Sequence, residues 1–124
     1  MKLLSVAVAM VVLAASFVVS KPAMANDALV VSICNYVAAD DKNRLRKKLK
    51  SSKVKLRNIY DGVSCNGLSL LQFSMSKKAN NVGVYIVKRL PGSKLKTGAD
   101  FNWATENGFA DSEIAVAIKA RAGF

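Results

Sequence analysis

The sequence begins with an apolar segment, and this segment limits how much of the chain remains to fold. Residues 3–19 are apolar apart from two serines, and a lysine precedes them. Further along, Ala23 and Ala25 place small side chains three positions and one position before the bond to Asn26. This order is typical of a secretory signal peptide with its cleavage site. We therefore expect residues 1–25 to be a signal peptide, cleaved between Ala25 and Asn26.

An uncleaved membrane anchor is the alternative for the same segment, because its 17 residues reach the lower limit for crossing a bilayer. The alanines at the cleavage site and the proline before them favour removal. Removal would leave one domain, residues 26–124, with 99 of the 124 residues. The loss of two lysines would lower the formal net charge from +11 to +9. No second long apolar run follows, so we expect a soluble product in the bacterial periplasm or outside the cell.

Cys34 and Cys65 are the only cysteines in the chain. Exported proteins meet an oxidising environment, in which cysteine pairs form and persist. We therefore expect the two residues to form a disulfide bond, and two free buried thiols are the alternative. By the chain-entropy relation, a bridge that closes a loop of about 32 residues would stabilise the fold by roughly 3–4 kcal/mol.

The chain contains no histidine, and this excludes several kinds of chemistry. Ser-His-Asp and Cys-His catalysis are impossible, as are zinc, copper and haem sites with histidine ligands. Two cysteines are too few for a structural zinc site or an iron–sulfur cluster. Cys65 has no histidine to activate it as a nucleophile, and no C-x-x-C motif is present. We therefore expect no enzyme activity, no catalytic residue, no metal site and no cofactor.

The chain after residue 26 predicts a mainly α-helical domain of short helix pairs joined by turn-rich loops. Apolar residues recur at one-turn spacing in several segments that follow a capping residue and end near glycine, proline or asparagine. In residues 52–67, by contrast, Val54 and Leu56 alternate with lysine and arginine, which favours a short strand or an extended loop. We expect helices over residues 28–39, 42–51, 70–78, 81–89 and 113–121.

Two stretches resemble ankyrin repeats. Gly98-Ala99-Asp100-Phe101-Asn102, followed by Glu106-Asn107-Gly108, is similar to the loop of that repeat, and Gly67-Leu68-Ser69-Leu70-Leu71-Gln72 is similar to its G-x-T-P-L-H opening. The glycines at 67 and 108 lie 41 residues apart, against a period of 33, so the resemblance implies an insertion in the loop 90–97. It implies a diverged ankyrin-like stack of two to three units over about residues 28–121. An unrelated small helical domain is the alternative.

The chain also resembles a family of small exported bacterial proteins that is classed only as a domain of unknown function. The resemblance rests on the stretch from Asp40 to Leu49, and on Tyr60-Asp61-Gly62 followed by Cys65-Asn66-Gly67. It covers about residues 30–90 and implies no activity, because none is established for the family.

Residues 42–57 have the most distinctive charge pattern in the chain, because nine of them are basic and none is acidic. On a helix, Leu45 and Leu49 would face inward, and the basic side chains would spread over the exposed side. Such a face could bind anionic lipid or lipopolysaccharide headgroups, at about 1 kcal/mol for each charge near the surface. A solvated face that keeps the protein soluble is the alternative. The residues expected to bind anions are Arg44, Arg46, Lys47, Lys48, Lys50, Lys53, Lys55 and Arg57.

These observations favour an exported, non-enzymatic binding module of the periplasm whose basic segment contacts an anionic component of the envelope. The ankyrin resemblance supports a rival, a periplasmic adaptor that binds an envelope protein, and it implies partner-binding roles for Tyr60, Phe101 and Trp103. A purely structural or stress-related envelope protein is a third alternative. Nucleic acid is not expected as a partner, because the basic stretch lacks interleaved aromatic residues for base stacking.

Overall fold

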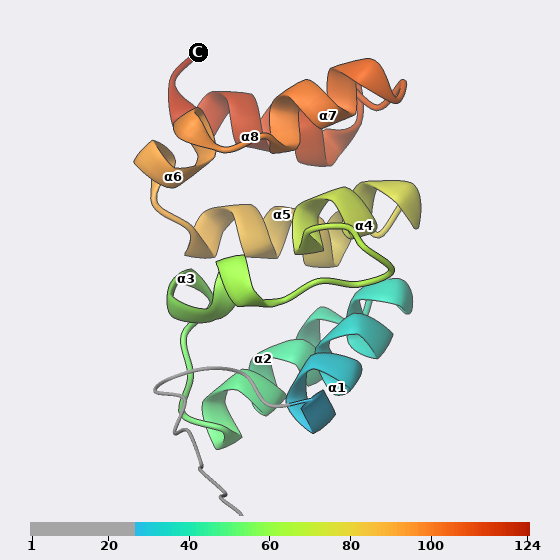
Figure 1. Ribbon diagram of the computed structural model, residues 1–124, viewed down its shortest axis with the longest axis vertical. Coiled ribbons are helices and arrows are strands. Elements are labelled where there is room, and N and C mark those ends of the chain that lie inside the picture. Colours follow the sequence, from blue (N-terminus) through green and yellow to red (C-terminus); the bar gives the residue numbers. More distant parts are fainter. Residues whose placement is uncertain (1–26) are drawn as a thin grey trace, which may run out of the picture.

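The computed structural model describes residues 27–124, which form short helices in three successive layers along the long axis of the molecule (Figure 1). The mainly helical fold class predicted from the sequence is confirmed. The predicted signal peptide lies outside the described residues. Within residues 27–124, no helix is long and apolar enough to cross a membrane.

The first layer pairs α1 (Asp27–Ala38) with α2 (Lys42–Ser51). Leucine, isoleucine and valine recur every fourth residue on α1 and are buried against the two leucines of α2, so one-turn spacing produces one apolar face on each helix. The helices are separated by a short turn because the Asp41 carboxylate accepts a hydrogen bond from the backbone N–H of Arg44 at 3.0 Å and caps α2.

The second layer pairs α4 (Leu70–Ser76) with α5 (Asn80–Arg89). Ser69 begins α4 with a capping box. The Ser69 hydroxyl accepts a hydrogen bond from the Gln72 backbone N–H, and the Gln72 side-chain oxygen accepts one from the Ser69 backbone N–H. Asp40 also connects this layer to the first. Its carboxylate accepts hydrogen bonds from the Val82 backbone at 2.8 Å and from the Asn81 side chain at 3.0 Å, at the start of α5.

The connection between these layers is helical over residues 56–62, so the strand or extended loop predicted for residues 52–67 is wrong over that part. It contains α3 (Leu56–Ile59) and a 3₁₀ turn, η1 (Tyr60–Gly62). Leu56 and Ile59 are three residues apart, and both become buried only if the backbone turns helically between them. In the described chain, the sole β-type pairing is an isolated bridge between Cys65 and Leu68.

The third layer holds α6 (Gly92–Thr97), α7 (Asp100–Glu106) and α8 (Glu113–Ala122). The ankyrin resemblance implies loops at 90–97 and 98–102, but residues 92–97 form α6 and α7 begins at residue 100. Pro91 has the fixed φ that suits the start of α6, and the helix buries Leu95 under the layer. Asp100 and Ala104, one turn apart, are both buried on α7. Of the residues that resemble an ankyrin loop, Asp100-Phe101-Asn102 and Glu106 therefore lie in α7, and the others flank that helix.

The layers stack in register, with α1, α4 and α7 in one column and α2, α5 and α8 in the other (Figure 1). Gly83 allows α5 and α8 to pack closely, since a Cβ at this position would overlap the side chain of Ile114. The predicted disulfide between Cys34 and Cys65 is present and links α1 to the connection before α4. The first layer is therefore joined covalently to the segment that leads into the second layer, and the third layer is held by packing, hydrogen bonds and the ion pair of Lys94 with Asp61.

Candidate functional site: a basic cleft

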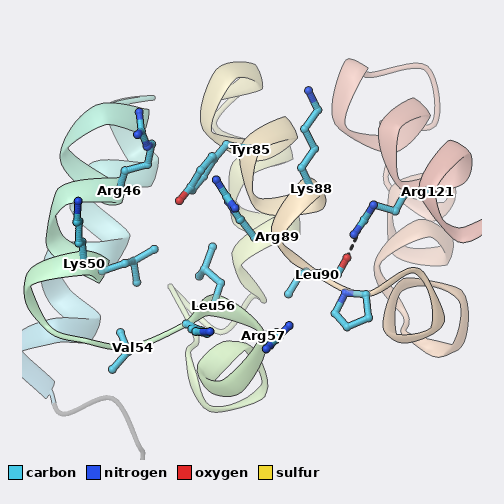
Figure 2. Close-up of a pocket in the computed structure, with 13 residues that line it drawn as sticks. Arg46, Lys50, Val54, Leu56, Arg57, Tyr85, Lys88, Arg89, Leu90 and Arg121 are labelled. Carbon is cyan, nitrogen blue, oxygen red and sulfur yellow. Dashed lines mark hydrogen bonds between the residues drawn. The ribbon is translucent and has the colours of Figure 1, made fainter.

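A cleft of about 630 Å³ lies between α2 and α5, closed at one end by α3 and bordered by the end of α8 (Figure 2). We call it the basic cleft. The residues that line it are Arg46, Leu49, Lys50, Val54, Lys55, Leu56, Arg57, Tyr85, Lys88, Arg89, Leu90, Pro91 and Arg121.

The stack of layers explains why cations from distant parts of the chain meet there. The second helices of the three layers, α2, α5 and α8, end on the same side of the molecule (Figure 1). Each of them carries two basic residues in its last turn. Cations are favourable at that position because the carbonyl end of a helix has partial negative charge. Stacking the three helices therefore gathers their terminal cations along one edge.

The lining of the basic cleft has one sign of charge. Seven of its residues are lysine or arginine, none is aspartate or glutamate, and the seven cationic side chains are exposed. Within residues 27–124, the ion pairs are Arg44 with Asp41 and Lys94 with Asp61, so neither neutralises a cation of the cleft. Like charges this close repel one another, and a bound anion would relieve that repulsion.

Two of the arginines are held by neighbouring groups. The Arg89 guanidinium lies over the ring of Tyr85, 5.1 Å from its centroid. The Nε of Arg121 donates a hydrogen bond of 2.7 Å to the carbonyl oxygen of Leu90 (Figure 2). Each guanidinium keeps further N–H groups, whose planar arrangement suits two oxygens of one phosphate or carboxylate. These contacts reduce the side-chain entropy that an anion would otherwise cost on binding.

The basic cleft also has an apolar floor. Leu49, Leu56 and Leu90 line it with side chains that are otherwise buried in the core, and Val54 and Tyr85 are half-buried there. The cleft therefore combines a cationic rim with an apolar base.

The predicted basic run divides into two groups in the structure. Arg46, Lys50, Lys55 and Arg57 line the basic cleft. The others, Arg44, Lys47, Lys48 and Lys53, lie outside its lining, and Arg44 makes an ion pair of 3.4 Å with Asp41.

Sequence reasoning missed Tyr85, Lys88, Arg89 and Arg121, which also line the cleft. A signal for three of them exists in the sequence, because each basic residue follows an apolar helical segment near its predicted end.

The three residues predicted to bind a partner differ in their burial. Tyr60 is only 7% exposed, and its hydroxyl donates a hydrogen bond of 2.6 Å to the buried carboxylate of Asp100, so its ring has no free face for a partner. Burial, and then the nearby Asp100 carboxylate, raise the pKa of Tyr60. Phe101 and Trp103 are half-buried on α7, where Trp103 stacks on Phe109 with ring centroids 5.5 Å apart.

The described chain contains no group of three or more cysteine, aspartate or glutamate side chains that could hold a metal ion. The groups that line the basic cleft are guanidinium and ammonium donors over an apolar base, so it offers hydrogen bonds and positive charge to a ligand.

The fold and the cleft define a small, disulfide-linked helical domain with a basic cleft. The chain belongs to the family described as Protein of unknown function (DUF3718), whose model matches residues 33–97. All residues that line the basic cleft lie in this matched segment, except Arg121. No curated protein and no solved structure matches the chain significantly.

Proposed function

We propose that this protein is a non-enzymatic binding module of the bacterial periplasm, and that its basic cleft holds an anionic component of the envelope. The single observation that carries the proposal is the lining of the cleft, with seven cations and no carboxylate. A solvated surface would keep a small protein soluble with interspersed charges of both signs. A concave site with one sign of charge instead raises the local concentration of an oppositely charged ligand.

The cellular location in this proposal rests on separate features. The apolar segment 3–19 and the alanines before Asn26 support export, and the disulfide between Cys34 and Cys65 supports an oxidising compartment. In that compartment, phospholipid and lipopolysaccharide headgroups supply abundant phosphate. Each cation near such a surface contributes about 1 kcal/mol at low ionic strength, and salt weakens this contribution.

Co-sedimentation with vesicles tests the proposal. We expect the purified protein to bind vesicles that contain phosphatidylglycerol or lipopolysaccharide at low salt, to bind less at high salt, and not to bind phosphatidylcholine vesicles. The variant Arg46→Gln with Arg89→Gln should lose at least tenfold in affinity. The matched variant Lys47→Gln with Lys53→Gln removes the same charge outside the cleft and should lose less than threefold.

Equal losses in the two variants would show that binding follows net charge and not the basic cleft. Absence of binding at low salt would remove the proposal altogether. Any contribution of the apolar N-terminal segment cancels in the comparison, because both variants carry it.

A second candidate is a periplasmic protein–protein adaptor, as the ankyrin resemblance implies. The observation that favours it is apolar exposure on the last layer, where the side chains of Val116 and Phe124 are 56% and 47% exposed. Phe124 also packs edge-to-face on Phe101, with ring centroids 5.2 Å apart. A pull-down from envelope extract that survives high salt and fails for Trp103→Ala would support the adaptor over the anion-binding module.

A further inference from the structure

The apolar and cationic parts of the basic cleft are separated in space. Figure 2 shows Arg46 and Lys50 on the α2 side of the cleft and Lys88 and Arg89 on the α5 side. Leu56 lies between these two sides (Figure 2), and its side chain is only 3% exposed. An anionic group held by the rim would therefore have apolar side chains beneath it.

The size of the basic cleft exceeds what a lone phosphate needs. With about 30 Å³ for each water-sized group, 630 Å³ corresponds to roughly twenty non-hydrogen atoms. This volume lies in the range of sites that hold small organic ligands. Such sites use apolar surface for affinity and a few polar groups for orientation, which matches the floor and rim of this cleft.

The apolar surface at this site is inside the cleft and does not protrude from it. The large apolar side chains that are most exposed in the described chain are Val31, Val116 and Phe124, and none of them lines the cleft. A protein that inserts into a bilayer would present such side chains next to its cationic residues. Here the geometry suits the opposite arrangement, in which an apolar chain enters the protein.

We propose that the basic cleft binds a single phosphate-bearing lipid, with the phosphate on the cationic rim and the first methylenes of an acyl chain on the apolar floor. This inference rests on the proposed function and specifies its ligand class. Rim arginines supply charge-assisted hydrogen bonds to the phosphate oxygens. The floor supplies affinity that salt does not screen, at about fourfold for each methylene that is fully buried.

Monomeric short-chain ligands separate the two contributions. The probes are glycerol 3-phosphate, dihexanoyl phosphatidic acid and dihexanoyl phosphatidylcholine, each titrated into the purified protein below its micelle concentration and followed by calorimetry. The first two probes differ only by the acyl chains. We expect dihexanoyl phosphatidic acid to bind at least tenfold more tightly than glycerol 3-phosphate, and dihexanoyl phosphatidylcholine to bind more weakly than dihexanoyl phosphatidic acid.

A variant of the floor supplies the second measurement. Val54→Ser changes a half-buried side chain that lines the cleft and removes no charge. It should reduce affinity for dihexanoyl phosphatidic acid by at least threefold and leave affinity for glycerol 3-phosphate unchanged. Val31→Ser is the control, because Val31 is 58% exposed on α1 and lies outside the cleft.

The outcomes distinguish this inference from the proposed function. If glycerol 3-phosphate and dihexanoyl phosphatidic acid bind within twofold of each other, the lipid inference is overturned, and the cleft is a site for phosphate headgroups alone. If neither glycerol 3-phosphate nor dihexanoyl phosphatidic acid binds, and anionic vesicles do not bind either, the proposed function itself fails. Tighter binding of phosphatidic acid that Val54→Ser does not reduce would also overturn the inference, because the chain would then lie elsewhere.

Discussion

Tyr60→Phe is the most informative test of how the second and third layers are held together. The Tyr60 hydroxyl donates to the Asp100 carboxylate at 2.6 Å and accepts from the Leu71 backbone N–H at 3.2 Å. Asp100 also accepts from the Ser69 hydroxyl at 2.8 Å and from the Gln72 side chain at 3.0 Å. The substitution removes one oxygen and keeps the ring, so the packing of the core stays the same.

The expected loss in the free energy of unfolding follows from the two groups that lose a hydrogen-bond partner. Asp100 is 8% exposed and would lose a charge-assisted hydrogen bond, for which about 2 kcal/mol is a central value. The buried Leu71 N–H would lose its acceptor, at about 1 kcal/mol. The free energy of unfolding should therefore fall by about 3 kcal/mol. For a domain of this size, that loss corresponds to a decrease in Tm of roughly 12–24 °C.

Urea and thermal unfolding followed by circular dichroism measure this loss. Tyr36→Phe is the control, because within residues 27–124 the Tyr36 hydroxyl has no hydrogen-bond partner, and this change should cost less than about 0.5 kcal/mol. If Tyr60→Phe and Tyr36→Phe differ by less than 1 kcal/mol, the buried network does not stabilise the layers and the reasoning is refuted.

Comparing the wild-type protein with Tyr60→Phe also predicts how stability changes with pH. Burial and the Asp100 carboxylate raise the pKa of Tyr60 above the ordinary tyrosine value of about 10, so the folded protein retains a proton that the unfolded chain releases. This contribution to stability is fully present below about pH 10 and is lost as the pH rises further. The wild-type protein should therefore lose more stability than Tyr60→Phe between pH 9.5 and 11.5.

Three further predictions concern the other contacts between layers. Reduction of the disulfide, which spans 31 residues, should lower the free energy of unfolding by about 3–4 kcal/mol, and an unchanged urea midpoint would contradict this. Gly83→Ala should cost about 1–2 kcal/mol, because the new Cβ overlaps the Ile114 side chain. Adding Ile114→Val should recover part of this loss, and additive losses in the double-mutant cycle would argue against the overlap. Asp40→Ala should cost about 2 kcal/mol, because it removes the acceptor for the Val82 N–H and places alanine at a residue whose own φ is +55°. Asp40→Asn should cost less than half as much, because asparagine keeps an acceptor oxygen and tolerates this φ.

Local signals in the sequence predicted most of the helices correctly. Asp41 and Ser69 cap the helices that follow them, and Leu45 and Leu49 bury the predicted face of α2. These features depend on a few neighbouring residues, so the sequence contains them in full. The disulfide was also predictable, because the chain has only two cysteines and its N-terminus suggests export.

The short helices were not predictable from such signals. In α3, Leu56 and Ile59 are buried by contact with other layers, and four residues are too few to show a helical period. In α7, Asp100 begins the helix with its carboxylate turned toward Tyr60, forty residues earlier in the chain. Local sequence favours a loop at both places, and tertiary contacts override it.

The candidate site shows the same division between local and distant information. Arg46 and Lys50 belong to a charge run that is visible in the sequence. Lys88, Arg89 and Arg121 join them only because the layers stack in register, and stacking is a property of the whole chain.

The disulfide has a consequence for the shape of the basic cleft. The cations of α2 and α5 face one another from the first and second layers, so their mutual repulsion pushes these layers apart. This outward force grows as salt is diluted, because the screening length lengthens from about 10 Å at 0.1 M to about 30 Å at 0.01 M. The bond between Cys34 and Cys65 ties the first layer to the connection that precedes the second, and so it opposes their separation. We therefore expect the width of the basic cleft to depend less on ionic strength in the oxidised protein than in the reduced protein.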